Sequence, residues 1–317
     1  MSSSPTISIL VVTYNHENYI GQCLESILMQ ETSANFEIIL GEDCSNDNTR
    51  KICEYYAQKY PEKIKLFLRS REDVIYINGR ATGRYNMIEN LKAAQGDYIA
   101  IVEGDDYWTD PQKLQKQLDF LERNQDCSMC CHAQVKELKG ERIADPRTDD
   151  LVHGEIYNAA DLFEHKLQPQ LRTLFFRNCL SLEEIQGDFF RNSIYGDFAL
   201  CFMLAKYGKI GYMDEVMAVY RIHEQGYAAR SLKTNMDYAN SRLGLVKIWC
   251  EAAKFSKTDN AAFEKGILKL YGQVIDRIGR KKALIKVLWH WNKMPVNFIL
   301  KLKISYRLKR RIIFNVK

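Results

Sequence analysis

The sequence predicts an α/β fold, with a mostly parallel central sheet flanked by helices and a helical, basic C-terminal extension. Apolar runs rich in β-branched residues alternate with stretches of helical spacing over roughly the first 100 residues, which is typical of βαβ units. Polar and acidic residues follow these runs directly, as expected at the ligand-binding edge of such a sheet. Basic residues are concentrated in the last part of the chain.

The run at residues 7–13 is short, apolar and rich in β-branched residues, as expected of a strand buried on both faces. The expected strands are residues 7–13, 36–40, 64–68 and 98–102. Between them, apolar residues recur every three or four positions, as on one face of a helix. The expected helices are residues 18–30, 47–59 and 84–94.

The later elements carry weaker signals. Asp110 is a suitable N-cap and Pro111 a suitable first helical residue, so a helix is expected to start there. Residues 127–225 have no clear period and are expected to mix strands with helices, whereas residues 232–280 look helical. The run Cys-Ser-Met-Cys-Cys-His at 127–132 favours a buried strand over a metal or haem site, because no second ligand pair has suitable spacing.

The nine cysteines form no disulfide framework and are interpreted as reduced thiols in a cytoplasmic protein. The N-terminus lacks the charged and apolar regions of a signal peptide. No apolar stretch reaches the ~18 residues that a membrane span needs. The sequence therefore predicts a cytoplasmic chain of 317 residues, long enough for a large core with an appendage.

The formal net charge of +5 is unevenly distributed. Residues 281–317 contain eleven Lys or Arg and no Asp or Glu, which leaves residues 1–280 with 34 basic and 40 acidic side chains. A nucleic-acid-binding protein would more often carry its basic residues on the main domain. The Trp, Leu and Ile residues interleaved in the tail instead predict peripheral contact with the inner face of the cell membrane. Packing of the tail on the protein itself is the alternative.

The first polar cluster is Glu103-Gly104-Asp105-Asp106, directly after an expected strand. Three carboxylates in four residues repel one another and are tolerated where a divalent cation neutralises them. Such a cation could bridge the carboxylates to the phosphates of a nucleotide. An acidic turn that caps the following helix is the alternative.

Two further clusters follow the expected strands 7–13 and 36–40. In the first, the Tyr14 ring could stack on a base, while Asn15 and Glu17 are equally suited to turns and caps. In the second, Asp43 could accept the N3–H of uracil or bind ribose, and residues 45–47 are good caps for the next helix. Three clusters that converge on one edge are more specific than any one of them.

At these residues the chain resembles the family 2 glycosyltransferases, which have the GT-A fold, in the form common among bacterial surface-polysaccharide enzymes. Residues 13–15 match the T-Y-N at the end of the family's first strand. Residues 42–49 resemble its D-D-G-S-x-D-x-T element, and residues 103–108 are an E-G-D-D-Y-W variant of its D-x-D metal motif. The resemblance is strong over residues 5–125 and fair over residues 173–226.

The resemblance implies a GT-A domain over residues 1–230, with a nucleotide-sugar-binding half at 1–125 and an acceptor half at 126–230. A helical C-terminal extension with a basic amphipathic tail would occupy residues 231–317. The residues implied to bind the nucleotide are Thr13, Tyr14, Asn15, Glu17, Asp43, Asn86, Glu103, Gly104 and Arg221. The implied cofactor is a divalent cation, Mn²⁺ or Mg²⁺, with the candidate ligands Asp105, Asp106 and His223.

The chain departs from the family pattern at Glu42, Cys44 and Glu103, where the family usually has Asp, Gly and Asp. The longer Glu103 side chain leaves ribose contact possible. Cys44 in place of glycine predicts that no positive φ occurs at this position. Three polar residues sit where family members place them between the third strand and the next helix: Asn78, Arg84 and Asn86.

The acceptor half offers one candidate base. Asp197 follows Gly196 at the start of a helix, where the family has the carboxylate that acts as catalytic base, and Asp188 is the nearest rival. Residues 220–223, Tyr-Arg-Ile-His, resemble the family's Y-R-x-H element, so His223 could ligate the metal and Arg221 could offset the diphosphate charge. By position and charge, Arg230 and Lys233 could belong to a segment that closes over the phosphates.

Together these features predict a metal-dependent, inverting transfer of a sugar from a nucleoside diphosphate sugar, with UDP favoured by family frequency. The acceptor would be a glycan or a lipid-linked molecule in cell-surface polysaccharide synthesis. The alternatives are a nucleotidyltransferase and a non-catalytic nucleotide-sugar-binding subunit; no nucleic-acid partner is expected. The sugar, the linkage and the oligomeric state stay open.

Overall fold

The computed structural model describes residues 6–146, 150–224, 226, 234–256, 260–279 and 283. Within them, the strands are β1 (Ile7–Thr13), β2 (Phe36–Glu42), β3 (Ile64–Leu68), β4 (Tyr76–Ile77), β5 (Arg80–Ala81), β6 (Tyr98–Glu103), β7 (Tyr107–Trp108), β8 (Cys127–Leu138), β9 (Glu141–Ala144), β10 (Ile156–Tyr157), β11 (Phe175–Arg177) and β12 (Lys209–Ile222). The helices are α1 (Ile20–Leu28), α2 (Thr49–Lys59), α3 (Arg84–Ala93), α4 (Lys113–Arg123), α5 (Ala159–Phe163), α6 (Leu182–Gln186), α7 (Asp188–Asn192), α8 (Gly196–Leu204), α10 (Asn235–Ala252) and α11 (Asn260–Ile278).

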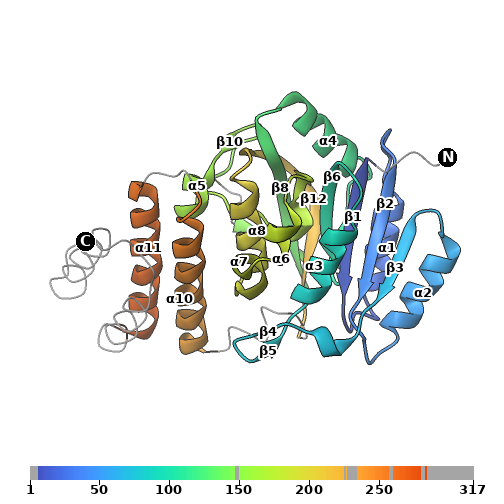
Figure 1. The fold of residues 1–317 in the computed structure, drawn as a ribbon, viewed down its shortest axis with the longest axis horizontal. Coiled ribbons are helices and arrows are strands. Elements are labelled where there is room, and N and C mark those ends of the chain that lie inside the picture. Colours follow the sequence, from blue (N-terminus) through green and yellow to red (C-terminus); the bar gives the residue numbers. More distant parts are fainter. Residues whose placement is uncertain are drawn as a thin grey trace.

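The central sheet has the strand order β10-β12-β8-β11-β6-β1-β2-β3, with β7 beside β12 and β9 beside β8 (Figure 1). Its long strands pair in parallel: β1 with β2 and β6, β2 with β3, and β8 with β12. The antiparallel pairs all involve the short strands β7, β9, β10 or β11. The predicted α/β fold with a mostly parallel sheet is confirmed.

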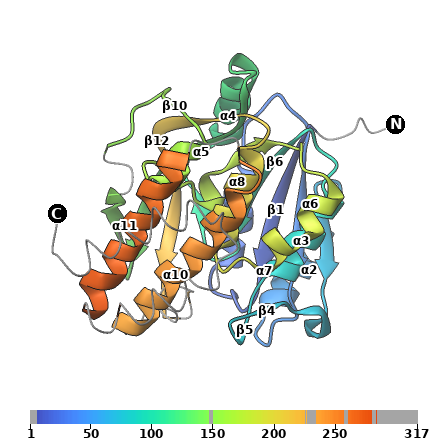
Figure 2. The same ribbon diagram turned by 60° about the vertical axis from the view of Figure 1, so that its left-hand side comes forward.

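Helices cover both faces of the sheet. The sheet therefore separates the core into two clusters, one on each face. In one, the apolar face of α1 packs with alternate residues of β1 and β2, as the helical spacing in the sequence predicted. In the other, α8 is buried from Phe198 to Leu204 because it lies between the sheet and α10 (Figure 2).

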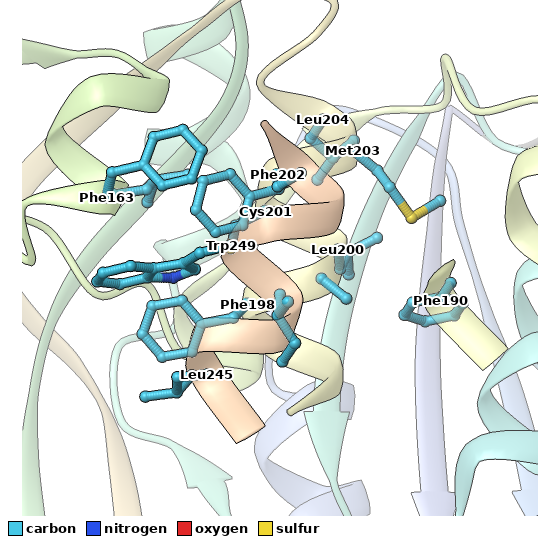
Figure 3. Close-up of a cluster of buried hydrophobic side chains, with 14 of the residues drawn as sticks. Phe163, Phe190, Phe198, Leu200, Cys201, Phe202, Met203, Leu204, Leu245 and Trp249 are labelled. Carbon is cyan, nitrogen blue, oxygen red and sulfur yellow. The ribbon is translucent and has the colours of Figure 1, made fainter. Parts of the chain in front are cut away.

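The second cluster extends into the C-terminal helices. α10 and α11 stand side by side at the end of the molecule opposite β3 (Figure 1). Figure 3 shows Trp249 of α10 against Phe163, and the two rings meet edge-on at 5.9 Å. The Phe163 ring also lies 4.6 Å from that of Phe202 in α8. Full burial of each such side chain contributes about 1.5–3 kcal/mol. The helical part of the C-terminal extension is therefore packed against the same core as α8.

Most predicted elements agree with the structure to within two residues, and one helix start is wrong. α4 begins at Lys113, not at Asp110 or Pro111. The reason is a turn before the helix, in which the Asp110 carboxylate accepts a hydrogen bond from the Gln112 N–H at 2.8 Å. The expected buried strand at 127–132 is confirmed as part of β8, and all nine cysteines are free.

Among the described residues, no helix is both long and apolar enough to cross a membrane. The basic tail lies outside the described residues apart from Ala283, as do Arg230 and Lys233, so those expectations stay predictions. The boundary at residue 230 between the expected GT-A domain and the C-terminal extension also stays a prediction.

Candidate active site

The three polar clusters meet at the carboxyl edge of the sheet because their strands are neighbours in register. Thr13 of β1 pairs with Glu42 of β2, and Val12 of β1 pairs with Glu103 of β6. The loops that leave these three strands therefore begin side by side, as the sequence predicted.

The loops after β1 and β2 hold each other in place. The Asn15 side chain accepts a hydrogen bond from the Asn46 N–H at 2.9 Å, and its own N–H donates to the Ser45 hydroxyl. The Glu17 carboxylate accepts from the Asn48 N–H at 3.0 Å. Asn15 and Glu17, both expected to bind nucleotide, thus have intramolecular partners that make them supports of the loop.

The expectation about Cys44 is wrong, because this residue has φ of 58°. The residues on both sides fix its conformation. The Asp43 N–H donates to the Thr13 carbonyl at 3.0 Å, and the Ser45 N–H donates to the Glu42 carboxylate at 2.6 Å. These bonds offset the ~1–2 kcal/mol that a left-handed conformation costs a residue with a side chain.

Asp43 lies just beyond β2, in contact with Arg71. It is buried, and one of its carboxylate oxygens accepts from Arg71 at 2.7 Å while the other has no hydrogen-bond partner. The Arg71 guanidinium also lies over the Tyr14 ring at 4.2 Å. Burial raises the pKa of Asp43 to about 6, although Arg71 opposes the rise. A buried carboxylate oxygen without a partner is costly, so it is a good place for a donor group of a ligand.

Two asparagines of α3 support the backbones of β1 and β2. The Asn86 amide donates to the Gly41 carbonyl at 2.7 Å, and the Asn90 amide donates to the Val11 carbonyl at 2.9 Å. A side chain at Gly41 would collide with both asparagines. Asn86, expected to bind nucleotide, is almost fully buried and ties α3 to β2.

Asp106 and Arg172 form a buried ion pair under the acidic loop. The Arg172 guanidinium donates to Asp106 and, at 3.1 Å, to Glu103. Burial alone would lower the pKa of Arg172, but the charges of Asp106 and Glu103 raise it above its usual value. The second Asp106 oxygen accepts from the Arg221 N–H at 2.9 Å. Both oxygens of Asp106 are thus engaged within the protein.

Arg221 also has protein partners. Its guanidinium donates to the Asp105 carbonyl at 2.8 Å, to Glu137 at 3.2 Å and to Gln22, and the side chain is buried. It fixes the backbone of the acidic loop, which differs from the expected direct contact with a diphosphate.

Asp105 lies beside two histidines. The His223 imidazole Nε2 lies 3.0 Å from the Asp105 Oδ2, and the His16 Nε2 lies 3.7 Å from the same oxygen. Burial alone would raise the pKa of Asp105, but the hydrogen bond from His223 and the charges of both histidines lower it to about 2. An ionised carboxylate beside imidazole nitrogens is a donor set that suits a divalent first-row metal ion. The residues present therefore fit a cation on Asp105 better than on Asp106.

Asp197 lies in the first turn of α8, whose N-cap is Tyr195. The pKa of Glu103 is raised by burial, with Arg172 opposing, and further by the negative charges of Asp105 and Asp197. Asp197 therefore acts on the same acidic loop, from the acceptor side. The rival Asp188 is exposed on α7, where it accepts a hydrogen bond from Asn192 at 3.0 Å.

Arg84 secures the turn that leads into α8. Its guanidinium donates to the carbonyls of Phe190 and, at 3.1 Å, Ser193. A side chain at Gly196 would collide with this guanidinium. Asn78 lies farther out, at the tip of the β4–β5 hairpin, where it and Gly79 both have positive φ.

The structure thus gathers Thr13, Tyr14, Asp43, Glu103, Gly104, Asp105, Asp197 and His223 along one edge. Sequence reasoning did not assign His16, Arg71 or Arg172. Arg71 follows the third strand, so the rule about strand ends could have found it. Arg172 lies in the part of the chain without a clear period, and nothing local marks it.

Comparison with known protein families matches the part of the chain that carries the three polar clusters. Residues 8–179 match the family model described as Glycosyl transferase family 2. An uncharacterized protein of Mycobacterium tuberculosis is 31% identical over 220 residues, which cover 69% of this chain and 60% of that protein. The chain therefore spans about 60% of the length of such curated relatives.

Two solved structures share the fold. TarS of S. aureus, residues 1–349 in complex with UDP-GlcNAc, has a TM-score of 0.63 at 16% identity, covering 97% of this chain and 88% of that one. The mannosyltransferase PcManGT from Pyrobaculum calidifontis, in complex with GDP-Man and Mn²⁺, has a TM-score of 0.58 at 16% identity, covering 98% and 81%.

Proposed function

Because the chain belongs to glycosyl transferase family 2, we propose that it is a metal-dependent, inverting glycosyltransferase that uses a nucleoside diphosphate sugar. One observation carries the proposal: three carboxylates in different environments, Asp43, Asp105 and Asp197, lie along one edge of the sheet. Each environment suits a different task in sugar transfer.

Asp43 binds the base of the donor. Its unpartnered oxygen accepts the N3–H of uracil, and Tyr14 and Arg71 lie against the same base. UDP is favoured by its frequency in the family, because the N3–H of thymine and the N1–H of guanine can donate to the same oxygen. The complexes of the structural neighbours with UDP-GlcNAc and GDP-Man support a nucleotide-sugar donor in general.

Asp105 and His223 would hold the divalent cation, because the His223 imidazole lies 3.0 Å from the Asp105 carboxylate. The Mn²⁺ in the PcManGT complex supports a divalent cation in general. The cation supplies positive charge to the oxygens of the departing diphosphate. Arg172 holds one carboxylate oxygen of Glu103, and the Glu103 side chain contacts the ribose of the donor. Arg221 contributes indirectly, by fixing the carbonyl of Asp105.

Asp197 accepts the proton of the acceptor hydroxyl. As that proton leaves, the acceptor oxygen forms a bond to the anomeric carbon, and the bond from this carbon to the diphosphate breaks on the opposite face. The electron pair of that bond goes to the diphosphate, so the anomeric configuration inverts. The acceptor is a glycan or a lipid-linked molecule of cell-surface polysaccharide synthesis.

The basic tail brings the enzyme to the inner face of the cell membrane, where a lipid-linked acceptor would lie. Its sequence supports this, since residues 281–317 combine eleven Lys or Arg with apolar residues. Flotation with anionic liposomes compares the full chain with one that ends at residue 280. Equal flotation of the two proteins would contradict a membrane role of the tail.

The test of the reaction is a donor screen. The full chain is incubated with Mn²⁺ or Mg²⁺ and a panel of UDP-, GDP- and dTDP-sugars, and the released nucleoside diphosphate is measured. We expect slow, metal-dependent release from one UDP-sugar, lost in Asp105→Asn, and NMR of the first product should show an inverted configuration.

Asp197→Asn separates the alternatives. For a glycosyltransferase it retains donor binding and loses transfer. If the chain binds a donor without ever releasing a nucleoside diphosphate, and Asp197→Asn changes nothing, a non-catalytic subunit is the better description. Release of pyrophosphate would indicate a nucleotidyltransferase.

A further inference from the structure

His16 and His223 both approach the Oδ2 atom of Asp105, and their ring centroids lie 6.4 Å apart. The His16 backbone N–H donates to the Thr49 hydroxyl at 2.7 Å, and its ring Nδ1 lies 3.2 Å from the Thr13 hydroxyl. With Nδ1 held by Thr13, the other ring nitrogen, Nε2, is directed at the Asp105 Oδ2, 3.7 Å away. A hydrogen-bonded second nitrogen is what orients histidines that bind metals.

Gly104 allows this arrangement. A Cβ atom at residue 104 would lie 2.6 Å from the Thr13 hydroxyl oxygen and 3.0 Å from the His16 Nδ1. Only glycine lets the acidic loop approach the Thr13–His16 pair so closely. The spacing between Asp105 and His16 thus depends on the residue just before Asp105.

We propose that His16 is a third protein ligand of the divalent cation, so that the site has two imidazoles and one carboxylate and prefers Mn²⁺ to Mg²⁺. This rests on the proposed function and deepens its metal site. Imidazole is a good ligand for late first-row ions, whereas Mg²⁺ prefers oxygen. Glu103 and Asp106 are held by Arg172 and do not make the site richer in oxygen.

The geometry requires a small closure. An octahedral ion with bonds of about 2.1 Å separates neighbouring ligand atoms by about 3.0 Å and opposite ones by about 4.2 Å. The two distances to Asp105, 3.0 and 3.7 Å, lie in this range. His16, Asp105 and His223 do not form a group with all ligand atoms within 4.8 Å of one another, so the two imidazoles, whose ring centroids are 6.4 Å apart, must approach each other when they bind one ion.

The first measurement is metal affinity of the full chain in the presence of UDP, by calorimetry with Mn²⁺ and with Mg²⁺. We expect His16→Ala to weaken Mn²⁺ binding at least about tenfold and Mg²⁺ binding by less than about threefold, which reduces the preference for Mn²⁺. His153→Ala is measured alongside, because His153, Asp214 and Glu215 are a described group whose ligand atoms all lie within 4.8 Å of one another. Metal bound there would be lost in His153→Ala and kept in His16→Ala, so the two sites are counted separately.

The second measurement is pulsed EPR of bound Mn²⁺, which detects directly coordinated imidazole nitrogen. The nitrogen signal should fall in His16→Ala and in His223→Ala, and disappear when both are replaced. If His16→Ala does not fold, as judged by circular dichroism, His16→Gln replaces it, since its amide can still meet Thr13.

The outcomes separate this inference from the proposed function. An unchanged nitrogen signal and an unchanged Mn²⁺ preference in the His16 variant, with binding lost in Asp105→Asn, would overturn the role of His16 alone. If wild type binds no Mn²⁺, or binds it equally well in Asp105→Asn, both the inference and the metal part of the proposed function are overturned.

Discussion

Asp43 and Asp105 occupy comparable positions, just past the carboxyl ends of β2 and β6, the two strands that flank β1. Asp43 has one arginine partner and one oxygen with none, and burial raises its pKa to about 6. Asp105 has two histidines beside it; they outweigh its burial and lower its pKa to about 2. The same residue type at the same edge is thus prepared for two tasks.

Under the proposed function, this difference would let one sheet edge separate recognition of the base from stabilisation of the diphosphate charge. A carboxylate that is difficult to ionise gains most from a ligand that donates a hydrogen bond to it. A carboxylate that stays ionised under nearly all conditions suits a cation. The assignments of Asp43 to the base and Asp105 to the metal therefore make different predictions for matching substitutions.

The largest effect is expected from Asp105→Asn. This change keeps the shape of the side chain and removes the charge that a cation needs, so we expect kcat to fall about 10³-fold. The measurement is release of nucleoside diphosphate at saturating donor. The matched change, Asp43→Asn, should mainly raise KM. Equal losses of kcat in the two variants would erase the distinction between the carboxylates.

Arg172→Met tests the support beneath Asp105. It leaves Asp106 buried without its main counter-charge, and such losses destabilise by about 3–5 kcal/mol. Urea unfolding of the variant measures this. Adding Asp106→Asn should restore part of the stability; if the double variant is no more stable than Arg172→Met, the ion pair is not what Arg172 supplies.

Asp43→Asn should also show how much the buried charge of Asp43 lowers the free energy of unfolding. Because folding raises the pKa of Asp43 from 3.8 to about 6, wild type loses stability as pH rises from about 4 through about 6. The amide has no charge to bury, so above pH 6 the variant should gain up to about 3 kcal/mol relative to wild type. Unfolding experiments at pH 4 and pH 8 test this. A difference that does not change with pH would contradict the raised pKa.

The smallest effect is expected in nucleoside binding. Uridine has no phosphate to titrate in this range, so it reports on Asp43 alone. Its affinity for wild type should fall several-fold as pH drops through about 6, because the protonated carboxyl is a poorer acceptor. Calorimetry at pH 5 and pH 7.5 measures it, with Asp43→Asn as the control that should show no such dependence.

The part of the fold that the sequence predicted well is the part held together by local patterns. Strands 7–13 and 64–68 agree residue for residue. β1 is buried on both faces, whereas β3 lies at the sheet edge, where Ile64 is buried and Lys65 and Leu68 are exposed. The polar carboxyl edge of the sheet was predicted because polar residues directly follow these apolar runs in the sequence. Asp105 and His223 were placed together only through the family resemblance, because the sequence separates them by more than 100 residues.

What escaped prediction depends on long-range partners. Arg172 lies in an irregular segment, and only the fold shows that it reaches Glu103 and Asp106. Cys44 takes a left-handed conformation because hydrogen bonds from flanking residues impose it, which propensity alone cannot indicate. For Asn15 and Glu17 the sequence left nucleotide contact and a turn or cap role both open, and the structure adds that they join two loops about 30 residues apart.

The clamp of Arg84 on the turn before α8 has a consequence for protein engineering. Arg84 belongs to the donor-binding half, yet it fixes the start of the helix that carries Asp197. An acceptor segment transplanted from a relative would therefore need a glycine at position 196 and carbonyls at positions 190 and 193 that accept from the same arginine. A transplanted segment without this glycine and these carbonyls would shift the start of α8, and with it the proposed base, relative to the donor. If Asp197 is the base, its placement depends on Arg84, a residue more than 100 positions earlier in the chain.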